Sequence, residues 1–272
     1  ALATGGAVVA AQYLGRREEE QACFSAKQLI LCTTAISAVI MVMFLIFGHQ
    51  LISLIFGKVD PEVLASAQTY LFITSMSYPF IALYNSCAAL YRAMGNSRIS
   101  MVTSLIMNSL NIVGNAILIY GLGMGVEGAA IPTLISRIVC AMLIVVMLRH
   151  RHDQIRLDSY FHLGFDGAMI KRILQIGVPN GLENGMFQIG KILVQSLVAM
   201  FGTASIAANA VANNFASMEI IPAAAIGLGL VTVVGQCVGA GKIEEARYYT
   251  KKLMKWAYMT SIALNVCILL GA

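Results

Sequence analysis

The chain has 272 residues, of which 58% are hydrophobic and only 11% carry a charged side chain, with a formal net charge of +5. Soluble domains usually carry about 25% charged residues, so this composition excludes a soluble enzyme, a disordered chain and a nucleic-acid-binding protein. The six cysteines are scattered through apolar stretches without C-x-x-C spacing, which excludes a disulfide framework. The composition is that of a membrane protein.

Long stretches with almost no charge follow one another along the chain, and each predicts a helix that crosses the membrane. They are 28–57, 63–91, 99–126, 128–148, 173–201, 203–241 and 256–272, and 1–15 resembles the end of another span. A helix needs about 20 residues to cross the hydrocarbon core, and lipid cannot satisfy an open backbone. Tyr78 and Pro79 predict a bent helix within 63–91. We therefore predict an all-α polytopic membrane protein with about seven to eight transmembrane helices.

The basic residues predict the orientation of these spans. Fifteen of the 18 Lys and Arg residues lie in the alternate loops 16–27, 92–98, 149–172 and 242–255. Short loops rich in Lys and Arg stay on the cytoplasmic side of a membrane, so we assign these four loops to the cytoplasm.

An internal repeat links the first span, 1–15, to the seventh, 203–241. Six residues recur in register at an offset of 224 positions. They are Gly5, Val9, Gln12, Gly15, Glu20 and Ala22, which recur as Gly229, Val233, Gln236, Gly239, Glu244 and Ala246. An even number of spans separates the copies, which predicts two halves related by a parallel pseudo-two-fold axis along the membrane normal. A repeat of this length predicts an intact protein about twice as long as the repeat.

Several blocks resemble the multidrug and toxic compound extrusion (MATE) transporters. They are the repeated motif GxxxxxxQxxGxxxxxEA, YRAMGNSRIS (91–100), NIVGNAILIYGLGMGVEGAAIPTLIS (111–136), GVPNGLENGMFQIGKILVQ (177–195) and the segment 201–242. The resemblance covers essentially the whole chain. It implies a two-lobed helix bundle, here without the first helix and the last three. The expected organisation is an N-lobe over 1–148, a cytoplasmic linker over 149–172 and a C-lobe over 173–272.

The resemblance implies secondary active multidrug efflux by antiport of Na⁺ or H⁺ with alternating access. The expected partners are amphipathic, cationic small molecules and the lipid bilayer, with no cofactor, and the expected protein is a monomer in the plasma (inner) membrane of a bacterium. One alternative is a lipid-linked oligosaccharide flippase of the same superfamily, whose cavity would be rich in Arg and Lys. A second alternative is an intramembrane enzyme, but no set of nucleophile, base and orienting residue is present in the spans.

Three residues are candidates for cation coupling. Asn111 and Asn115 belong to a polar stripe with Ser104 and Asn108 at helical spacing, which faces either other helices or a cavity. In one bacterial branch of the family that this chain resembles, the position matching Asn115 is an aspartate that takes part in cation coupling. The amide of Asn115 cannot titrate, but its oxygen can bind Na⁺. Glu183 follows Pro179 within a span, where a carboxylate can take up a proton or, with freed backbone carbonyls, bind Na⁺. Glu183 is the only position at which we expect a metal ion.

Six further polar residues within the spans are candidates for the substrate cavity. They are Asn108, Arg137, Lys191, Asn209, Asn213 and Glu219. Lys191 lies two helical turns beyond Glu183 and either neutralises it or repels cationic substrates. Glu219 either attracts a cationic compound or pairs with Arg137, which otherwise binds backbone carbonyls.

Overall fold

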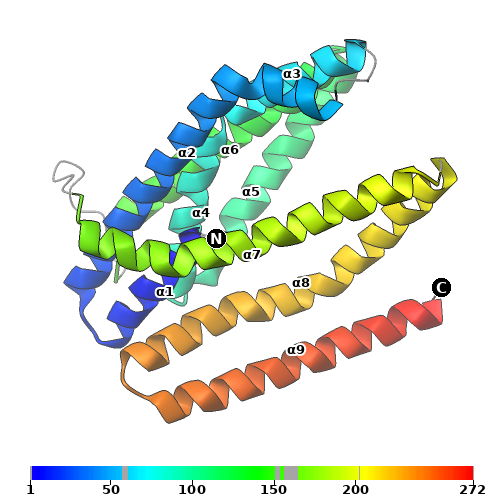
Figure 1. Ribbon diagram of the computed structural model, residues 1–272. Coiled ribbons are helices and arrows are strands. Elements are labelled where there is room, and N and C mark those ends of the chain that lie inside the picture. The colour runs from blue at the N-terminus through cyan, green and yellow to red at the C-terminus, as the bar shows by residue number, and fades with distance from the viewer. Residues whose placement is uncertain (1, 57–60, 151–153, 156–164, 202, 272) are drawn as a thin grey trace. The chain divides into compact units, whose positions relative to one another are not determined.

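The computed structural model describes residues 2–56, 61–150, 154–155, 165–201 and 203–271. Its elements in chain order are α1 (Leu2–Gly15), α2 (Glu19–Phe56), α3 (Pro61–Ser75), α4 (Tyr78–Ala93), α5 (Ser97–Asn115), the π-helical segment η1 (Ala116–Gly121), α6 (Val126–His150), α7 (Gly167–Ala199), α8 (Thr203–Gly239) and α9 (Ile243–Gly271) (Figure 1). The described ranges contain helices and no strand, which confirms the all-α fold class. Half of the predicted linker over 149–172, namely 151–153 and 156–164, lies outside the described residues.

The apolar stretch 63–91 forms two helices rather than one. α3 ends at Ser75 and α4 begins at Tyr78, with Pro79 in its first turn. Pro is favoured there because the first helical N–H groups have no partner within the helix. The Ser77 hydroxyl donates to the Thr74 carbonyl at 2.6 Å and satisfies one acceptor at the break. The bend predicted at Tyr78 and Pro79 is therefore confirmed, and it is sharp enough to separate two helices.

Four helices are long and apolar enough to cross a membrane by length and composition within the described residues. These segments are Glu19–Ile52, Ser97–Gly121, Val126–Arg149 and Ala208–Gly239. α7 and α9 have 33 and 29 residues, which is also more than a bilayer requires, but they contain more charged and polar residues.

Residues 23–170 form one of two compact units. In it α6 packs against α3, α4 and α5. Small residues allow close approach: a Cβ atom on Gly114 of α5 would lie 2.7 Å from the Cβ of Pro132 on α6. α2 and α4 are joined by a buried hydrogen bond of 2.8 Å between the hydroxyls of Thr33 and Ser86. Small residues and polar pairs of this kind replace the hydrophobic effect as the source of helix association in lipid.

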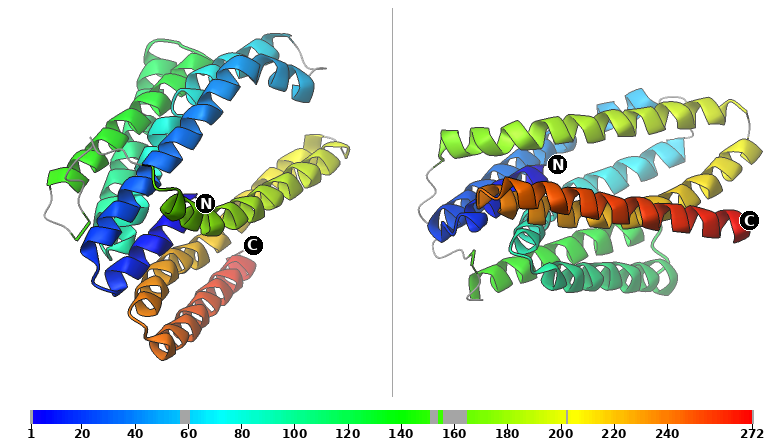
Figure 2. Two further views of the ribbon diagram at one scale, coloured as in Figure 1. Left: turned by 60° about the vertical axis from the view of Figure 1, so that its left-hand side comes forward. Right: turned by 90° about the horizontal axis from the view of Figure 1, so that it is seen from below.

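Residues 1–22 and 171–272 form the second unit, in which α8 packs against both α1 and α9. α8 and α9 run antiparallel as a long hairpin in all three ribbon views (Figures 1 and 2). α1 is grouped with the later helices because it crosses α8. The lobe boundaries at residues 148 and 173 stay a prediction.

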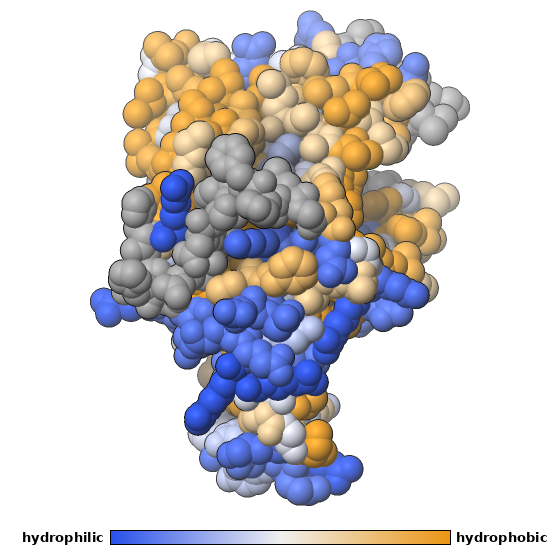
Figure 3. All heavy atoms as spheres, turned by 90° about the vertical axis from the view of Figure 1, so that its left-hand side faces the viewer, coloured by the Kyte–Doolittle hydropathy of each residue, from blue (hydrophilic) through white to orange (hydrophobic). Residues whose placement is uncertain are grey.

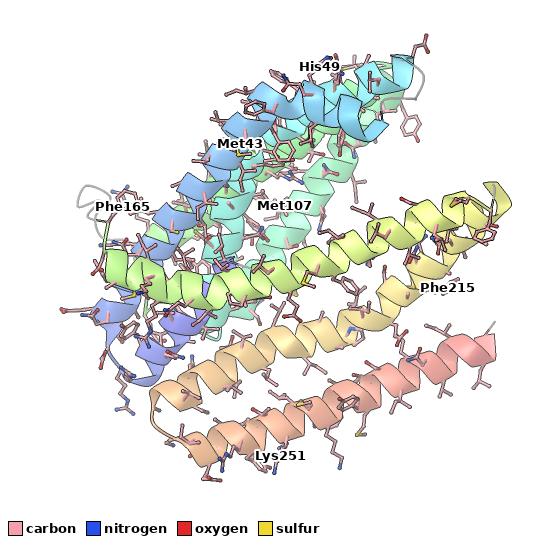
Figure 4. The ribbon with its side chains drawn as sticks, viewed as in Figure 1. Met43, His49, Met107, Phe165, Phe215 and Lys251 are labelled. Atoms are coloured by element: carbon pink, nitrogen blue, oxygen red, sulfur yellow. The ribbon has the colours of Figure 1, made fainter. Side chains whose placement is uncertain are left out.

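The α8–α9 turn carries the charges predicted for a cytoplasmic loop. Lys242 pairs with Glu245 at 2.9 Å and Arg247 with Glu244 at 3.2 Å, and all four side chains are largely exposed. Figure 3 shows hydrophilic side chains over this turn, at the lower end of the face it presents. Farther along the hairpin the exposed side chains are large and apolar, such as Phe215 on α8 (Figure 4). The hairpin therefore has a polar end and an apolar body, as a membrane helix pair requires.

Candidate functional site

The two copies of the sequence repeat touch each other where α1 crosses α8. A Cβ atom built on Gly15 would collide with the backbone carbonyl of Gln236, and one built on Gly239 would collide with the backbone carbonyl of Gln12. Gln12 and Gly15 correspond to Gln236 and Gly239 in the repeat, so each contact is the two-fold counterpart of the other. Gly235 lies between them, and a Cβ atom there would lie 2.9 Å from the Cβ of Ala11, its own repeat partner. This reciprocal crossing is the contact expected on a pseudo-two-fold axis.

Both helices also end in the same way. Arg17 follows α1 with φ of +62°, and its counterpart Gly241 follows α8 with φ of +75°. Glu18 and Lys242 each donate a backbone hydrogen bond of 3.0 Å to the carbonyl five residues earlier. This is the Schellman arrangement, which satisfies the last helical carbonyls and turns the chain sharply. The repeat detected in the sequence is therefore a repeat of backbone geometry as well.

A polar cluster joins α7 to this crossing. The Arg172 guanidinium donates to the Gln12 side-chain oxygen at 2.9 Å and to the Tyr13 hydroxyl at 3.0 Å. It also lies 5.3 Å from the centre of the Tyr13 ring. Gln12 thus meets α8 through its backbone and α7 through its side chain. Charge-assisted hydrogen bonds of this kind are stronger than neutral ones, so the cluster fixes α7 beside the crossing.

In the other unit, the structure brings two cation-coupling candidates together at the end of α5. Asn115 donates to the side-chain oxygen of Asn111 at 3.2 Å, and Asn111 donates to the Thr133 hydroxyl of α6 at 2.9 Å. The side-chain oxygen of Asn115 is buried and has no hydrogen-bond partner among the described residues. The π-helical segment η1 begins at the next residue. π-Helical turns are frequent at functional sites, and an unpaired amide oxygen is a ligand that a hard cation such as Na⁺ prefers.

Two other candidates lie in this unit. Arg137 of α6 donates to the Ser77 hydroxyl at 2.6 Å, at the break between α3 and α4. Its partner is therefore a serine hydroxyl, neither a carboxylate nor a backbone carbonyl. Asn108 lies on α5 and is exposed.

Glu183 is exposed on α7, as is every residue over 182–197, in a helix that continues through Pro179. Because proline has no N–H, the carbonyl four residues earlier loses its helical donor. One carbonyl in this region is satisfied by a side chain, since Asn184 donates to the backbone oxygen of Asn180 at 2.7 Å. Lys191 does not pair with Glu183: within the described residues its ammonium lies 5.0 Å over the Phe187 ring and forms no ion pair. Glu183 is the only acidic residue in α7.

Glu219 links α8 to α9. Its carboxylate accepts a hydrogen bond of 2.8 Å from the side chain of Asn265. Glu219 therefore bonds to a side-chain amide, whereas Arg137 bonds to the Ser77 hydroxyl in the other unit.

A pocket between α7 and α8 collects three further candidates. It has a volume of about 520 Å³ and is lined by Met186, Phe187, Gly190, Lys191, Val194, Gln195, Asn209 and Asn213. Asn209 donates to the Gln195 side-chain oxygen at 3.3 Å across the pocket. The structure thus brings Lys191, Asn209 and Asn213 together in one pocket, and their role in a substrate cavity stays a prediction.

Sequence reasoning missed the roles of Tyr13, Arg172 and Thr133 as partners of predicted residues. It identified Gln12, Gly15, Gln236 and Gly239 only as matched positions. The repeated Gln-x-x-Gly spacing was a usable signal, because small residues at a matched position allow two helices to meet at a two-fold axis.

The fold and the reciprocal crossing define a polytopic helical membrane protein built from two related halves. The MatE family model matches residues 1–117 and 179–272, and the chain belongs to this family of MATE transporters. Similar proteins include the uncharacterized transporter YisQ of Bacillus subtilis, which is 25% identical over 97% of this chain, and the multidrug export protein MepA of Staphylococcus haemolyticus, which is 22% identical over 98%. The chain spans 58% of the length of each.

Two solved structures of MATE family transporters of the MOP superfamily share the fold. An outward-facing conformation aligns with a TM-score of 0.89 at 23% identity, covering 100% of this chain and 60% of that one. An inward-facing conformation aligns with a TM-score of 0.74 at 23% identity, covering 99% and 61%. The higher score belongs to the outward-facing conformation.

Proposed function

We propose that the protein exports amphipathic, cationic compounds by antiport of Na⁺ or H⁺ with alternating access, as a monomer in the bacterial plasma membrane. The observation that carries this proposal is the reciprocal crossing of α1 and α8. Its residues flank 16–27 and 242–255, two of the four loops assigned to the cytoplasm, so a packed crossing closes the cytoplasmic side. The multidrug export protein MepA and the two MATE conformations support the same reading.

Alternating access requires that this crossing separate during the cycle. A cation that binds one state more tightly and a substrate that binds the other more tightly will shift the population in opposite directions. Each elementary charge that moves through 100 mV adds about 2.3 kcal/mol to the driving force. Glycine at the contact allows the two helices to separate and pack again, because their backbones meet without interlocking side chains.

The candidate coupling residues divide by chemistry. Asn115 offers an unpartnered oxygen and no titratable group, which favours Na⁺ over H⁺ at that position. Glu183 offers a carboxylate that serves for either ion. We propose that both act in coupling, with Asn111 orienting the Asn115 amide through their hydrogen bond.

Replacing Asn115 by leucine is expected to raise the Na⁺ concentration for half-maximal efflux about tenfold if Na⁺ is the coupling ion. The reason is that one oxygen ligand is lost while the number and branching of the side-chain heavy atoms are kept. Asn115→Asp keeps an oxygen and adds a charge, so it should retain tight Na⁺ dependence or gain dependence on protons. An Asn115→Leu variant with the Na⁺ dependence of the parent would contradict a ligand role.

Efflux of a cationic dye from liposomes that contain the intact protein tests the proposal. We expect efflux to rise when a Na⁺ or proton gradient is imposed and to stop when it is collapsed. The flippase alternative predicts instead that a fluorescent pyrophosphate-linked lipid changes leaflet while the dye stays inside. Within the predicted spans, the positive charges of Arg137 and Lys191 are balanced by the negative charges of Glu183 and Glu219, which favours the dye. Dye efflux that ignores both gradients would overturn the antiport mechanism.

A further inference from the structure

The pocket between α7 and α8 has one charged side chain, and it is positive. Among the lining residues only Lys191 is ionisable, and the others are apolar side chains, two side-chain amides of asparagine, one of glutamine and a glycine. The two acidic residues of α7 and α8, Glu183 and Glu219, are not in the lining, and Glu219 is already bonded to Asn265. A pocket built for a cation alone would have the opposite charge.

The lysine is held in place but not neutralised. Its ammonium lies 5.0 Å from the centre of the Phe187 ring, one turn earlier on α7. A ring face attracts a cation without accepting its charge, so the ammonium keeps its hydrogen-bond donors for another group. Lys191 forms no ion pair within the described residues, and a lysine inside a membrane span is costly unless it faces a cavity or a partner.

The amides across the pocket add donors rather than negative charge. Asn209 uses one N–H group to bond the Gln195 oxygen at 3.3 Å, which consumes an acceptor and leaves N–H groups on both side chains. The rest of the lining, including Met186, Phe187 and Val194, is apolar. A volume of about 520 Å³ falls in the usual range for small-molecule sites.

We propose that this pocket binds the carboxylate of a transported compound, with Lys191 as the charged partner, the amides as neutral donors and the apolar wall against the aromatic body. The inference rests on the proposed function, since it extends the substrates from simple cations to compounds that also carry an anionic group. Lys191 then selects substrates rather than repelling cations. The class is an amphipathic aromatic acid, zwitterions included.

The test uses a xanthene dye with a free carboxylate and its methyl ester, which differ only in that group. Binding of each dye to the purified intact protein is measured by fluorescence anisotropy without any gradient. We expect Lys191→Gln to weaken binding of the acid on the order of tenfold and to leave binding of the ester within about twofold, because a charge-assisted hydrogen bond is lost. Lys191→Arg should keep the binding of the acid close to that of the parent.

The outcomes separate the two proposals. Equal weakening of both dyes by Lys191→Gln, or no change in either, overturns carboxylate binding at Lys191. A selective loss for the acid supports it, even if gradient-driven efflux is absent and the proposed antiport fails. Size-exclusion chromatography of each variant confirms that it is folded, and Lys191→Arg keeps the test valid if Lys191→Gln is not.

Discussion

Replacing Gly15 or Gly239 by alanine is expected to lower dye efflux at least about fivefold. Each new methyl group would collide with a backbone carbonyl of the other helix, and a backbone atom cannot turn away as a side-chain end can. Overpacking of this kind costs about 1–3 kcal/mol, which changes the ratio of closed to open crossings by about fivefold to 150-fold. Because the contacts are two-fold counterparts, the two variants should have similar effects.

Gly227 of α8 provides a matched control. A Cβ atom at this position meets no atom within 4 Å. Alanine in an open helical position should stabilise the helix by roughly 0.5–1 kcal/mol and leave efflux unchanged. Efflux at the parental rate in Gly15→Ala and Gly239→Ala, with protein levels matched, would show that the crossing does not need to close.

Replacing Glu183 by glutamine is expected to remove the response of efflux to an imposed gradient. Glu183 is exposed on α7, has no ion-pair partner within the described residues, and is the only carboxylate of that helix. A charged side chain at the centre of a membrane helix costs about 2.5–3.5 kcal/mol on insertion scales. Packing alone does not require such a cost, which favours a functional role for Glu183. Glutamine keeps the size and removes the charge.

The comparison for Glu183 needs two further variants. Glu183→Asp keeps the carboxylate and should keep a reduced gradient response. Glu245→Gln removes a carboxylate from an exposed ion pair in the α8–α9 turn and should leave efflux unchanged, because exposed pairs contribute little. Gradient-driven efflux that is the same in Glu183→Gln and the parent would exclude Glu183 from coupling.

The helices and the symmetry could be predicted from the sequence, because the helices follow from local composition and the symmetry from an internal repeat. Charge-free stretches predict spans, since lipid penalises charge at every position, and the repeat in 5–22 and 229–246 predicted two related halves. The bend at Pro79 followed from the missing N–H of proline. Its exact form, a separation of α3 from α4, depends on how Ser77 satisfies the local carbonyls and bonds Arg137.

The contacts of the candidate site could not be predicted from the sequence, because they join residues far apart in the chain. The pairing of Asn111 with Thr133 depends on the close approach of α5 and α6 at Gly114. The sequence left Lys191 between two roles, and the geometry adds a third, since its nearest charged candidate, Glu183, lies outside the pocket. Periodicity identifies the face of a helix but not the neighbour of that face.

The proposed mechanism requires the crossing of α1 and α8 to open and close during transport. Arg16 and Ala240 are two-fold counterparts, and both are exposed beside the crossing. Spin labels on Arg16→Cys and Ala240→Cys would report the distance between the helices by double electron–electron resonance. Cys23, Cys237 and Cys267 must be replaced first, whereas Cys32, Cys87 and Cys140 are buried and can stay.

We predict two distance populations in the intact protein. The shorter should correspond to the packed crossing, and the balance between the two should shift when the coupling cation is exchanged for substrate. A single distance that stays the same with cation, with substrate and with neither would contradict the account.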